Sequence, residues 1–308
     1  MDHTPSTSAT YAWLNGAPEG RHSALIRSFL LAVAAVDGSP EVSADGPLPR
    51  DFRGGAHLLA TVGDELVGYA HLDTEGDAFG RQVVEAFIHP DARGRGIGTE
   101  LVRTVLDRAA GGVRFWSHGN HPAAAAIAAR FGLTKVREML KMRLDLSTAD
   151  LPEPRWRDGV RVRTFVPGQD EAALVEVNRR AFDWHPEQGA LTVADVEATE
   201  KEPWFDPAGF FLAVDADDRV LGFHWTKVHP GGEGEVYVVG VDPAAQGGGL
   251  GKALTLAGLA HLVDLGLSEV ILYVESDNAP AVTVYRGLGF ERAEAHVQYS
   301  STVDTDRG

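Results

Sequence analysis

The chain of 308 residues contains one glycine-rich segment twice, and this repeat limits the folds that it can adopt. The first copy is residues 86–98 (AFIHPDARGRGIG) and the second is 239–251 (VGVDPAAQGGGLG), at an offset of 153 positions. Each copy reads as an apolar strand, an x-Pro turn, a glycine-rich loop and the start of a helix. A shorter match sets residues 130–133 (RFGL) beside 287–290 (GLGF), at an offset of 157. A duplicated α/β domain explains both matches.

The spacing of apolar residues predicts a similar order of elements around each copy. In the first half we expect helices at 23–36, 96–110 and 122–131 and strands at 57–61, 66–72, 81–88, 113–117 and 136–144. In the second half we expect helices at 170–182, 193–201, 251–265 and 279–286 and strands at 160–165, 210–214, 221–228, 235–241, 269–274 and 293–299. The expected fold class is α/β, with a mixed sheet in each of two tandem domains.

A break in this pattern separates the two domains. Residues 147–159 contain Ser147, Thr148 and two prolines among alternating charges, which is typical of a linker. We therefore expect an N-terminal domain at 1–146 and a C-terminal domain at 160–308. The length agrees, because compact domains usually have about 100–200 residues each.

Composition excludes several classes of protein. The net charge is −16, and residues 151–308 carry 13 Lys and Arg against 26 Asp and Glu, so nucleic acid is not an expected partner. The chain has no cysteine, which excludes a disulfide scaffold, a thiolate metal site and a cysteine nucleophile. The N-terminus lacks a signal-peptide pattern, and the apolar runs are too short to span a bilayer. We expect a cytoplasmic monomer with no membrane partner.

Both glycine-rich loops are suited to bind an anion. Glycines allow a close approach of the backbone, and a helix that starts there directs unpaired N–H groups to the same point. Neither loop fits a dinucleotide fingerprint, because Gly94, Gly96 and Gly98 follow the third strand with the wrong spacing. Neither is a P-loop, since Lys252 is followed by Ala253 instead of Ser or Thr. A pyrophosphate on some other cofactor is the remaining expectation.

The loops resemble the acetyl-CoA site of the Gcn5-related N-acetyltransferases (GNATs). That family has a strand, an x-Pro turn and Gln/Arg-x-x-Gly-x-Gly at the start of a helix, and residues 93–98 (RGRGIG) and 246–251 (QGGGLG) both match. Residues 278–290 (NAPAVTVYRGLGF) resemble the second motif of the family, a short helix with a tyrosine and a closing Gly-Phe. The resemblance covers both halves. It implies a tandem acetyltransferase with acetyl-CoA as co-substrate and no metal.

Carried over position by position, the resemblance implies two sets of acetyl-CoA contacts. In the second half they are Val239, Gly240, Val241, Gln246, Gly247, Gly248, Gly249, Leu250, Gly251, Lys252, Asn278, Ala279, Pro280, Ala281, Val282 and Thr283. In the first half they are Glu85, Ala86, Phe87, Arg93, Gly94, Arg95, Gly96, Ile97 and Gly98.

Two residues of the second half are candidates for proton transfer. An amine is mostly protonated at neutral pH and needs a base, and Glu235 is the only acid in its apolar strand. Strand alternation predicts that Glu235, Tyr237, Val239 and Val241 share one side. Tyr285 lies where the family has its acid, and a phenol with a pKa near 10 keeps its proton for a departing thiolate. Backbone N–H groups around Val239 would stabilise the oxyanion.

The first half lacks both groups. The offset of 153 sets Glu235 against Gln82, and the offset of 157 sets Tyr285 against Ala128. We therefore expect the first domain to be non-catalytic, either holding acetyl-CoA or only shaping the cleft. A displaced base at Glu85 is the alternative. His118 and His121 are three apart but have no evident third ligand, so we expect no metal site.

One tandem branch of the family acetylates the cysteinyl amine of a cysteine–glucosamine–inositol conjugate. Five segments resemble that branch: 183–189 (DWHPEQG), 204–207 (WFDP), 222–227 (GFHWTK), 234–240 (GEVYVVG) and 272–278 (LYVESDN). Carried over, this resemblance implies substrate contacts at Asp37, Glu187, Lys227, Glu235 and Tyr273. Two alternatives stay open: transfer to another amine, such as an aminoglycoside, a polyamine or a protein N-terminus, and a non-catalytic module that senses acetyl-CoA. A sensor has no need of Glu235 or Tyr285.

Overall fold

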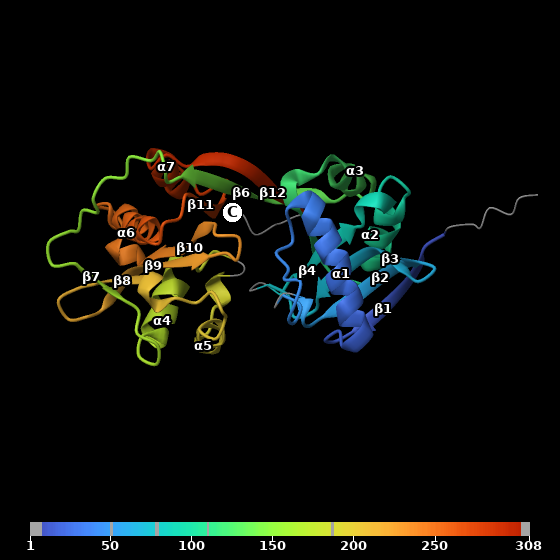
Figure 1. Ribbon diagram of the computed structural model, residues 1–308, viewed down its shortest axis with the longest axis horizontal. Coiled ribbons are helices and arrows are strands. Elements are labelled where there is room, and N and C mark those ends of the chain that lie inside the picture. The colour runs from blue at the N-terminus through green and yellow to red at the C-terminus, as the bar shows by residue number, and fades with distance from the viewer. Residues whose placement is uncertain (1–7, 50–51, 78–79, 110, 186–187, 303–308) are drawn as a thin grey trace, which may run out of the picture. The chain divides into compact units, whose positions relative to one another are not determined.

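The computed structural model describes residues 8–49, 52–77, 80–109, 111–185 and 188–302. The chain divides into two compact units, Met1–Glu138 with His296–Gly308 and Met139–Ala295. Each unit is described by itself (Figure 1). Within the described ranges, no helix is both long and apolar enough to cross a membrane.

The first unit is a mixed sheet with three helices. Its elements in chain order are β1 (Thr10–Asn15), α1 (Gly20–Asp37), β2 (Ala56–Val62), β3 (Glu65–Asp73), β4 (Gln82–Ile88), α2 (Ile97–Arg108), β5 (Val113–Ser117) and α3 (Pro122–Arg130). The end of β12 (Glu291–Ser300) completes the sheet, whose strand order is β1-β2-β3-β4-β5-β12. Of the neighbouring strands, β4 and β5 run parallel, whereas β1–β2, β2–β3, β3–β4 and β5–β12 are antiparallel.

The second unit repeats this plan. Its elements are β6 (Thr134–Asp145), β7 (Arg161–Thr164), α4 (Glu171–Ala181), α5 (Val193–Thr199), β8 (Phe210–Val214), β9 (Val220–Val228), β10 (Gly234–Val241), α6 (Leu250–Asp264), β11 (Glu269–Glu275) and α7 (Ala279–Gly287). The strand order is β6-β11-β10-β9-β8-β7, with β10 and β11 parallel. The predicted elements are therefore present, with ends shifted by a few residues.

The closing strand of each half of the sequence begins in its own unit and ends in the other unit. Residues Val297–Ser300 of β12 pair with β5, although β12 ends the second half. Residues 139–145 of β6, which we assigned to the first domain, pair with β11. The units thus divide between Glu138 and Met139, whereas the linker was expected at 147–159. The ranges 1–146 and 160–308 stay a prediction about the domains of the chain.

Helices cover both faces of each sheet. In the first unit, Leu58 and Ala60 of β2 pack in the core that contains α2, while the intervening Leu59 packs in the core that contains α1. In the second unit, Phe223 and Trp225 of β9 pack with α4 and α5. Figure 1 shows α6 on the opposite side of β8–β10 from α4 and α5. The period-two alternation of strands explains this division into two cores.

The strand β1 was not predicted. Its six residues, TYAWLN, contain only the four-residue apolar run 11–14, and none of the six is fully buried at this edge of the sheet. Tyr11 and Trp13 are its half-buried aromatics, and the Arg108 guanidinium lies 4.2 Å from the Trp13 ring centre. Edge strands bury too little surface to show a strong pattern.

A buried histidine fixes how closely α6 can approach β9. His224 is fully buried, and its Nδ1 lies 2.8 Å from the carbonyl oxygen of Leu254 on α6. Burial lowers the pKa of His224 to about 4, so the ring is neutral at physiological pH. A Cβ on Gly258 would lie only 2.1 Å from the His224 ring. Glycine at position 258 is therefore required for the contact between helix and sheet.

We expect the Gly258→Ala substitution to destabilise the protein, although alanine favours helices. Overpacking against His224 should lower the free energy of unfolding by about 1–3 kcal/mol. Gly287→Ala in α7 is the matched control, because a Cβ there meets nothing within 4 Å. Urea denaturation of the three proteins measures the difference. Equal stability of Gly258→Ala and the parent would contradict the tight contact.

Candidate active site

The loop between β10 and α6 forms an anion cradle. Gly247, Gly248 and Gly249 have φ angles of 80°, 62° and 82°, in the left-handed region that favours glycine. Leu250 begins α6, whose first N–H groups have no partner within the helix. Asp242 anchors the turn: its Oδ1 accepts from the N–H of Ala244 at 2.9 Å, and its Oδ2 lies 2.8 Å from Nη2 of Arg180.

Beside this cradle, β10 and β11 diverge. Their parallel pairing covers only Gly234–Val236 against Val270–Leu272. A β-bulge also interrupts the pairing of β10 with β9 between Val236 and Val238, which leaves Tyr237 as the extra residue. The divergence opens a gap between two strands that would otherwise be hydrogen-bonded along their length. Backbone groups of β10 beyond Val238 are therefore available on that side for a ligand.

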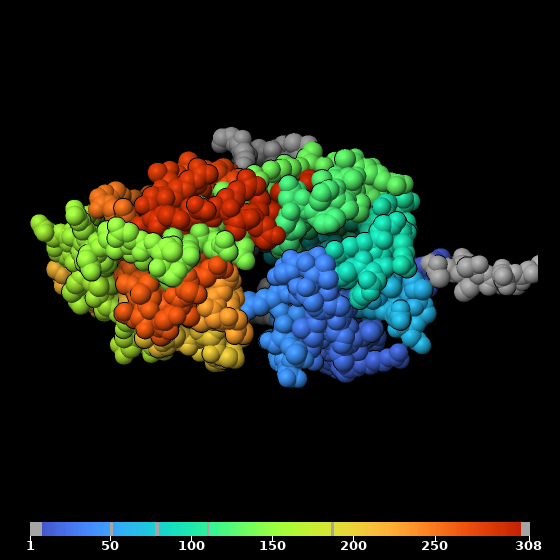
Figure 2. Space-filling view, turned by 45° about the horizontal axis from the view of Figure 1, so that its top comes forward, coloured from blue at the N-terminus to red at the C-terminus, as the bar shows by residue number. Residues whose placement is uncertain are grey.

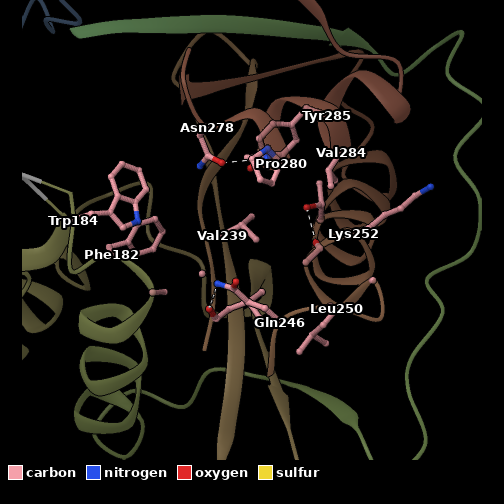
Figure 3. A pocket seen from close by; sticks show the side chains of 18 of the residues that line it. Phe182, Trp184, Val239, Gln246, Leu250, Lys252, Asn278, Pro280, Val284 and Tyr285 are labelled. Carbon is pink, nitrogen blue, oxygen red and sulfur yellow. Dashed lines mark hydrogen bonds between the residues drawn. The ribbon is translucent and has the colours of Figure 1, made fainter. Parts of the chain in front are cut away.

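A cavity of about 670 Å³ occupies this gap. Figure 3 shows Gln246 and Leu250 near one end, Asn278 and Tyr285 near the other, and Val239 between them. The lining residues are Ala181, Phe182, Trp184, Val239, Gly240, Val241, Gln246, Gly247, Gly249, Leu250, Gly251, Lys252, Thr255, Asp277, Asn278, Pro280, Ala281, Val284 and Tyr285. A long ligand with an anionic end fits this arrangement of cradle and elongated cavity.

Most of the predicted acetyl-CoA contacts of the second half line this cavity. Four do not: Gly248, Ala279, Val282 and Thr283. Val282 is instead a buried core residue, and Thr283 is exposed on α7, where its hydroxyl donates to the carbonyl oxygen of Ala279. The roles of the individual residues stay predictions.

One side of the cavity, formed by residues that follow α4, was not predicted from the sequence. Phe182 and Trp184 line it there, and Trp184 is 47% exposed. Figure 3 shows both rings across the cavity from α6. The sequence offered only a weak signal, two aromatic residues, Phe182 and Trp184, at the end of a predicted helix.

Tyr285 lies on α7 within the cavity wall, as the motif predicted. Its ring packs edge-on against Phe290 at 5.8 Å between ring centres. Burial raises the pKa of Tyr285 to about 12. The phenol therefore holds its proton at neutral pH and can act as a hydrogen-bond donor inside the cavity.

Glu235 is buried at the start of β10, outside the set of cavity-lining residues. It is 6% exposed, and its Oε2 lies 2.7 Å from Nε2 of His229. His229 belongs to the turn between β9 and β10, where its N–H donates to the carbonyl oxygen of Glu233. A carboxylate only accepts hydrogen bonds, so the imidazole N–H donates to Glu235 and fixes its orientation.

The bulge corrects one expectation about Glu235. Val236 packs in the core with α6, and Val238 packs in the core with α4, although simple alternation would put both on one face. Tyr237 contacts Trp225 on the α4 side, at 5.5 Å between ring centres. Val239 returns to the α6 side. The prediction that Glu235, Tyr237, Val239 and Val241 share one side is therefore wrong, because the extra residue changes the phase of the strand.

The structure brings some of the predicted substrate residues together. Lys227 is the cross-strand partner of Glu235, and its Nζ lies 5.2 Å from the Trp204 ring centre and 5.9 Å from that of Tyr237. Tyr273, on β11, is 40% exposed. Asp37 lies in the first unit at the end of α1, and Glu187 is outside the described residues.

The first unit has a similar loop with different surroundings. Gly94 and Gly96 have φ angles of 74° and 82°, close to those of Gly247 and Gly249. Arg93, however, donates two hydrogen bonds to the carboxylate of Asp37, at 2.9 and 2.5 Å. Both residues were predicted as ligand contacts, and here they bind each other.

The β4 strand of the first unit has no bulge in its pairing with β3. In the parallel ladder of the first unit, residues 82–84 pair with 113–115. In the second unit, residues 234–236 pair with 270–272 in the same way. Glu235 therefore corresponds to Val83, whereas the uniform offset of 153 set it against Gln82. Valine cannot accept a proton either, so the expectation that this position lacks a base is unchanged.

Glu85 of the first unit faces a histidine pair. Its Oε2 lies 2.8 Å from Nε2 of His118, whose Nδ1 lies 3.1 Å from Nδ1 of His296. Ala128, opposite Tyr285 in the repeat, is buried in the core. Among the residues that the structure describes, no group of three His, Asp or Glu side chains could hold a metal ion.

Known proteins that are similar to this chain in sequence and structure include acetyltransferases. The sequence matches the acetyltransferase (GNAT) family over residues 31–133 and 174–290. It is 60% identical to a mycothiol acetyltransferase of Saccharomonospora viridis, over 89% of this chain and 94% of that protein. A GCN5-related N-acetyltransferase from Sphaerobacter thermophilus has a similar structure, with a TM-score of 0.71 at 25% identity and 96% coverage of both chains. A tandem GNAT protein from the clavulanic acid biosynthesis pathway gives 0.70 at 18% identity, over 95% of this chain and 98% of that one.

We expect Trp184 to report ligand binding in this cavity. Adding coenzyme A should change the tryptophan fluorescence, and Trp184→Phe should remove most of that change while keeping an aromatic ring in the wall. Trp204→Phe is the control, because Trp204 does not line the cavity. A full fluorescence change in Trp184→Phe would place the ligand elsewhere.

Proposed function

The chain belongs to the GNAT family and, within it, to the mycothiol acetyltransferases, and on this premise we propose that its second unit acetylates the cysteinyl amine of desacetylmycothiol. Acetyl-CoA is the donor, and the reaction is the last step of mycothiol biosynthesis. One observation carries the proposal: the glycine cradle and Tyr285 line the same cavity, beside β10 where it separates from β11.

The cradle suits the pyrophosphate of acetyl-CoA. The turn at Gly247–Gly249 presents backbone N–H groups, and the positive end of the α6 dipole favours an anion there. The pantetheine arm then follows the gap beside Val239–Val241, which directs the thioester towards Tyr285. N–H groups of β10 at this gap are placed to stabilise the oxyanion of the tetrahedral intermediate.

Glu235 is the proposed base. It removes a proton from the substrate ammonium, directly or through a water, and the hydrogen bond from His229 keeps the carboxylate oriented. The freed amine attacks the acetyl carbonyl and forms the C–N bond of a tetrahedral intermediate, which then collapses as the C–S bond breaks. The substrate nitrogen loses two protons in all. The first passes through Glu235 to solvent before the attack, and the second replaces the proton that Tyr285 gives to the sulfur.

Tyr285 is the proposed acid. Its raised pKa keeps the phenol protonated until negative charge develops on the sulfur. A free thiol has a pKa of about 8.5, so a lasting phenolate is unfavourable and Tyr285 must recover its proton from the ammonium of the intermediate. We propose that the acetyl group passes directly from CoA to the amine, and the lack of cysteine excludes an acetyl-cysteine intermediate.

The substrate needs polar contacts for its many hydroxyl groups. We propose Lys227, Glu235 and Tyr273 as contacts in the second unit, with Asp37 and Glu187 as further candidates. The first unit is proposed not to turn over, because Val83 and Ala128 stand at the positions of the base and the acid. Its own cradle is proposed either to hold acetyl-CoA or only to shape the cleft.

The Glu235→Gln substitution should reveal the base. Mixing the enzyme, acetyl-CoA and desacetylmycothiol should release CoA thiol, and Glu235→Gln should lower kcat/KM about 100-fold at pH 7. The loss should shrink towards pH 9, because the amine then loses its proton unaided. Thiol release followed across this pH range is the measurement.

Glu233→Gln is the matched control, a carboxylate two positions earlier in the adjoining turn. A loss that is equal at every pH would make Glu235 a positioning residue. No thiol release by the parent enzyme, with acetyl-CoA still bound, would refute the transferase activity itself.

Tyr285→Phe should slow the breaking of the C–S bond and leave binding intact. We expect kcat to fall at least tenfold, since general acids contribute about 10²–10⁴-fold, while the Kd of acetyl-CoA stays nearly unchanged. Tyr299→Phe in β12 is the control. Steady-state kinetics with calorimetric titration separates the two effects. A large loss of acetyl-CoA affinity would contradict the role as an acid.

A further inference from the structure

The segment between the two repeats packs on the second cradle. Trp156 contacts the apolar cluster that contains Ala245, Leu250 and Leu254, at the turn before α6 and in its first helical turns. Figure 2 shows the yellow-green linker lying across the surface beside the orange helix α6. The linker therefore packs against the turn and the helix that form the cradle.

Arg157 extends this contact to the glycine loop. Its Nη2 donates to the carbonyl oxygen of Ala245 at 2.9 Å. Its Cδ lies 2.9 Å from the point that a Cβ on Gly248 would occupy. Any side chain at position 248 would collide with Arg157, so the glycine and the arginine occupy complementary space.

The first cradle carries an arginine in its own loop. The offset of 153 sets Arg95 against Gly248, and Arg95 donates through Nη2 to the carbonyl oxygen of Asp91 at 2.7 Å. In the second loop, Arg157 donates to the carbonyl oxygen of Ala245. The same offset sets Ala245 against Ala92, the residue after Asp91. A guanidinium thus braces both loops, but in the second it comes from outside the repeat.

The second loop cannot easily carry that arginine itself. Gly248 has a φ of 62°, whereas Arg95 is not among the residues with positive φ. Residues 243–251 are all uncharged, in a half of the chain with 13 basic and 26 acidic residues. An anionic cofactor needs a local positive charge in such a field. Lys252, at the start of α6, supplies one positive charge, and Arg157 of the linker supplies a second.

We propose that Arg157 binds a phosphate group of coenzyme A at the second cradle. The inference rests on the proposed function, because it assumes that this cradle holds the cofactor. A guanidinium has five N–H donors in a planar fork that matches phosphate, and the bond to Ala245 occupies one of them. Arg157 is half-buried, so its charge stays accessible to partial screening by salt. The linker between the repeats is then also a cofactor-binding element.

Arg157→Gln is the test, since glutamine keeps a polar side chain with N–H donors but carries no charge. We expect the Kd of coenzyme A to rise about tenfold, the effect of losing one charge-assisted hydrogen bond. The effect should shrink at high salt. Arg155→Gln is the matched control, an exposed arginine two residues earlier. Calorimetric titration measures binding, and Trp184 fluorescence assigns it to the second cradle.

Titration with 3′-dephospho-CoA identifies the phosphate. A loss for coenzyme A alone would assign Arg157 to the 3′-phosphate, and a salt-dependent loss for both ligands would assign it to the pyrophosphate. Either result supports the proposal. An unchanged Kd overturns the proposal. It is also overturned if both ligands lose affinity equally, if salt does not alter this loss, and if the Tm falls, because a purely structural contact would behave in this way.

Failure of the proposed function would look different. In that case the parent enzyme itself would not bind coenzyme A at the second cradle, or would bind it without acetylating desacetylmycothiol. Because the Arg157 titrations need no acceptor, they measure the phosphate contact independently of turnover.

Discussion

The early end of the β10–β11 ladder is the constraint on which the site depends. Parallel neighbours in a sheet normally pair along their length, because an unpaired backbone N–H or C=O costs free energy when it is buried. Here pairing stops after Val236, and the strands separate around a cavity. The unmet hydrogen-bonding capacity of β10, the glycine turn and the start of α6 all face one elongated space. A ligand that is amide-like along its arm and anionic at its end satisfies all three.

The two repeats show which parts of this arrangement are general. Both have a short parallel ladder, and both have left-handed glycines before a helix. Only β10 has the bulge at Tyr237, and after this extra residue Val238 packs with α4 while Val239 packs with α6. A single insertion thus changes which face of the sheet each later residue of the strand meets. In the first unit the strand is regular, and the arginine of the loop binds Asp37.

Local patterns in the sequence predicted local features well. The glycine loops and the helix with Tyr285 could be found because their conformations depend on neighbouring residues. The bulge at Tyr237 could not be predicted, because it depends on the register between β9 and β10. No glycine or proline lies at the bulge itself, at 236–238 or at 225–226. The bond between His229 and Glu235 joins a turn to a strand, and Arg157 meets Gly248 from 91 positions away. Contacts of this kind need tertiary structure.

The placement of β12 affects how the molecule is made. The edge of β5 is completed by Val297–Ser300, which follow most of the second half of the sequence and therefore leave the ribosome after it. During synthesis the first unit must therefore wait with one sheet edge unpaired, although most of its residues have long emerged. Such edges readily pair with other chains. The first half of the sequence thus reaches its final sheet only after the second half has been translated.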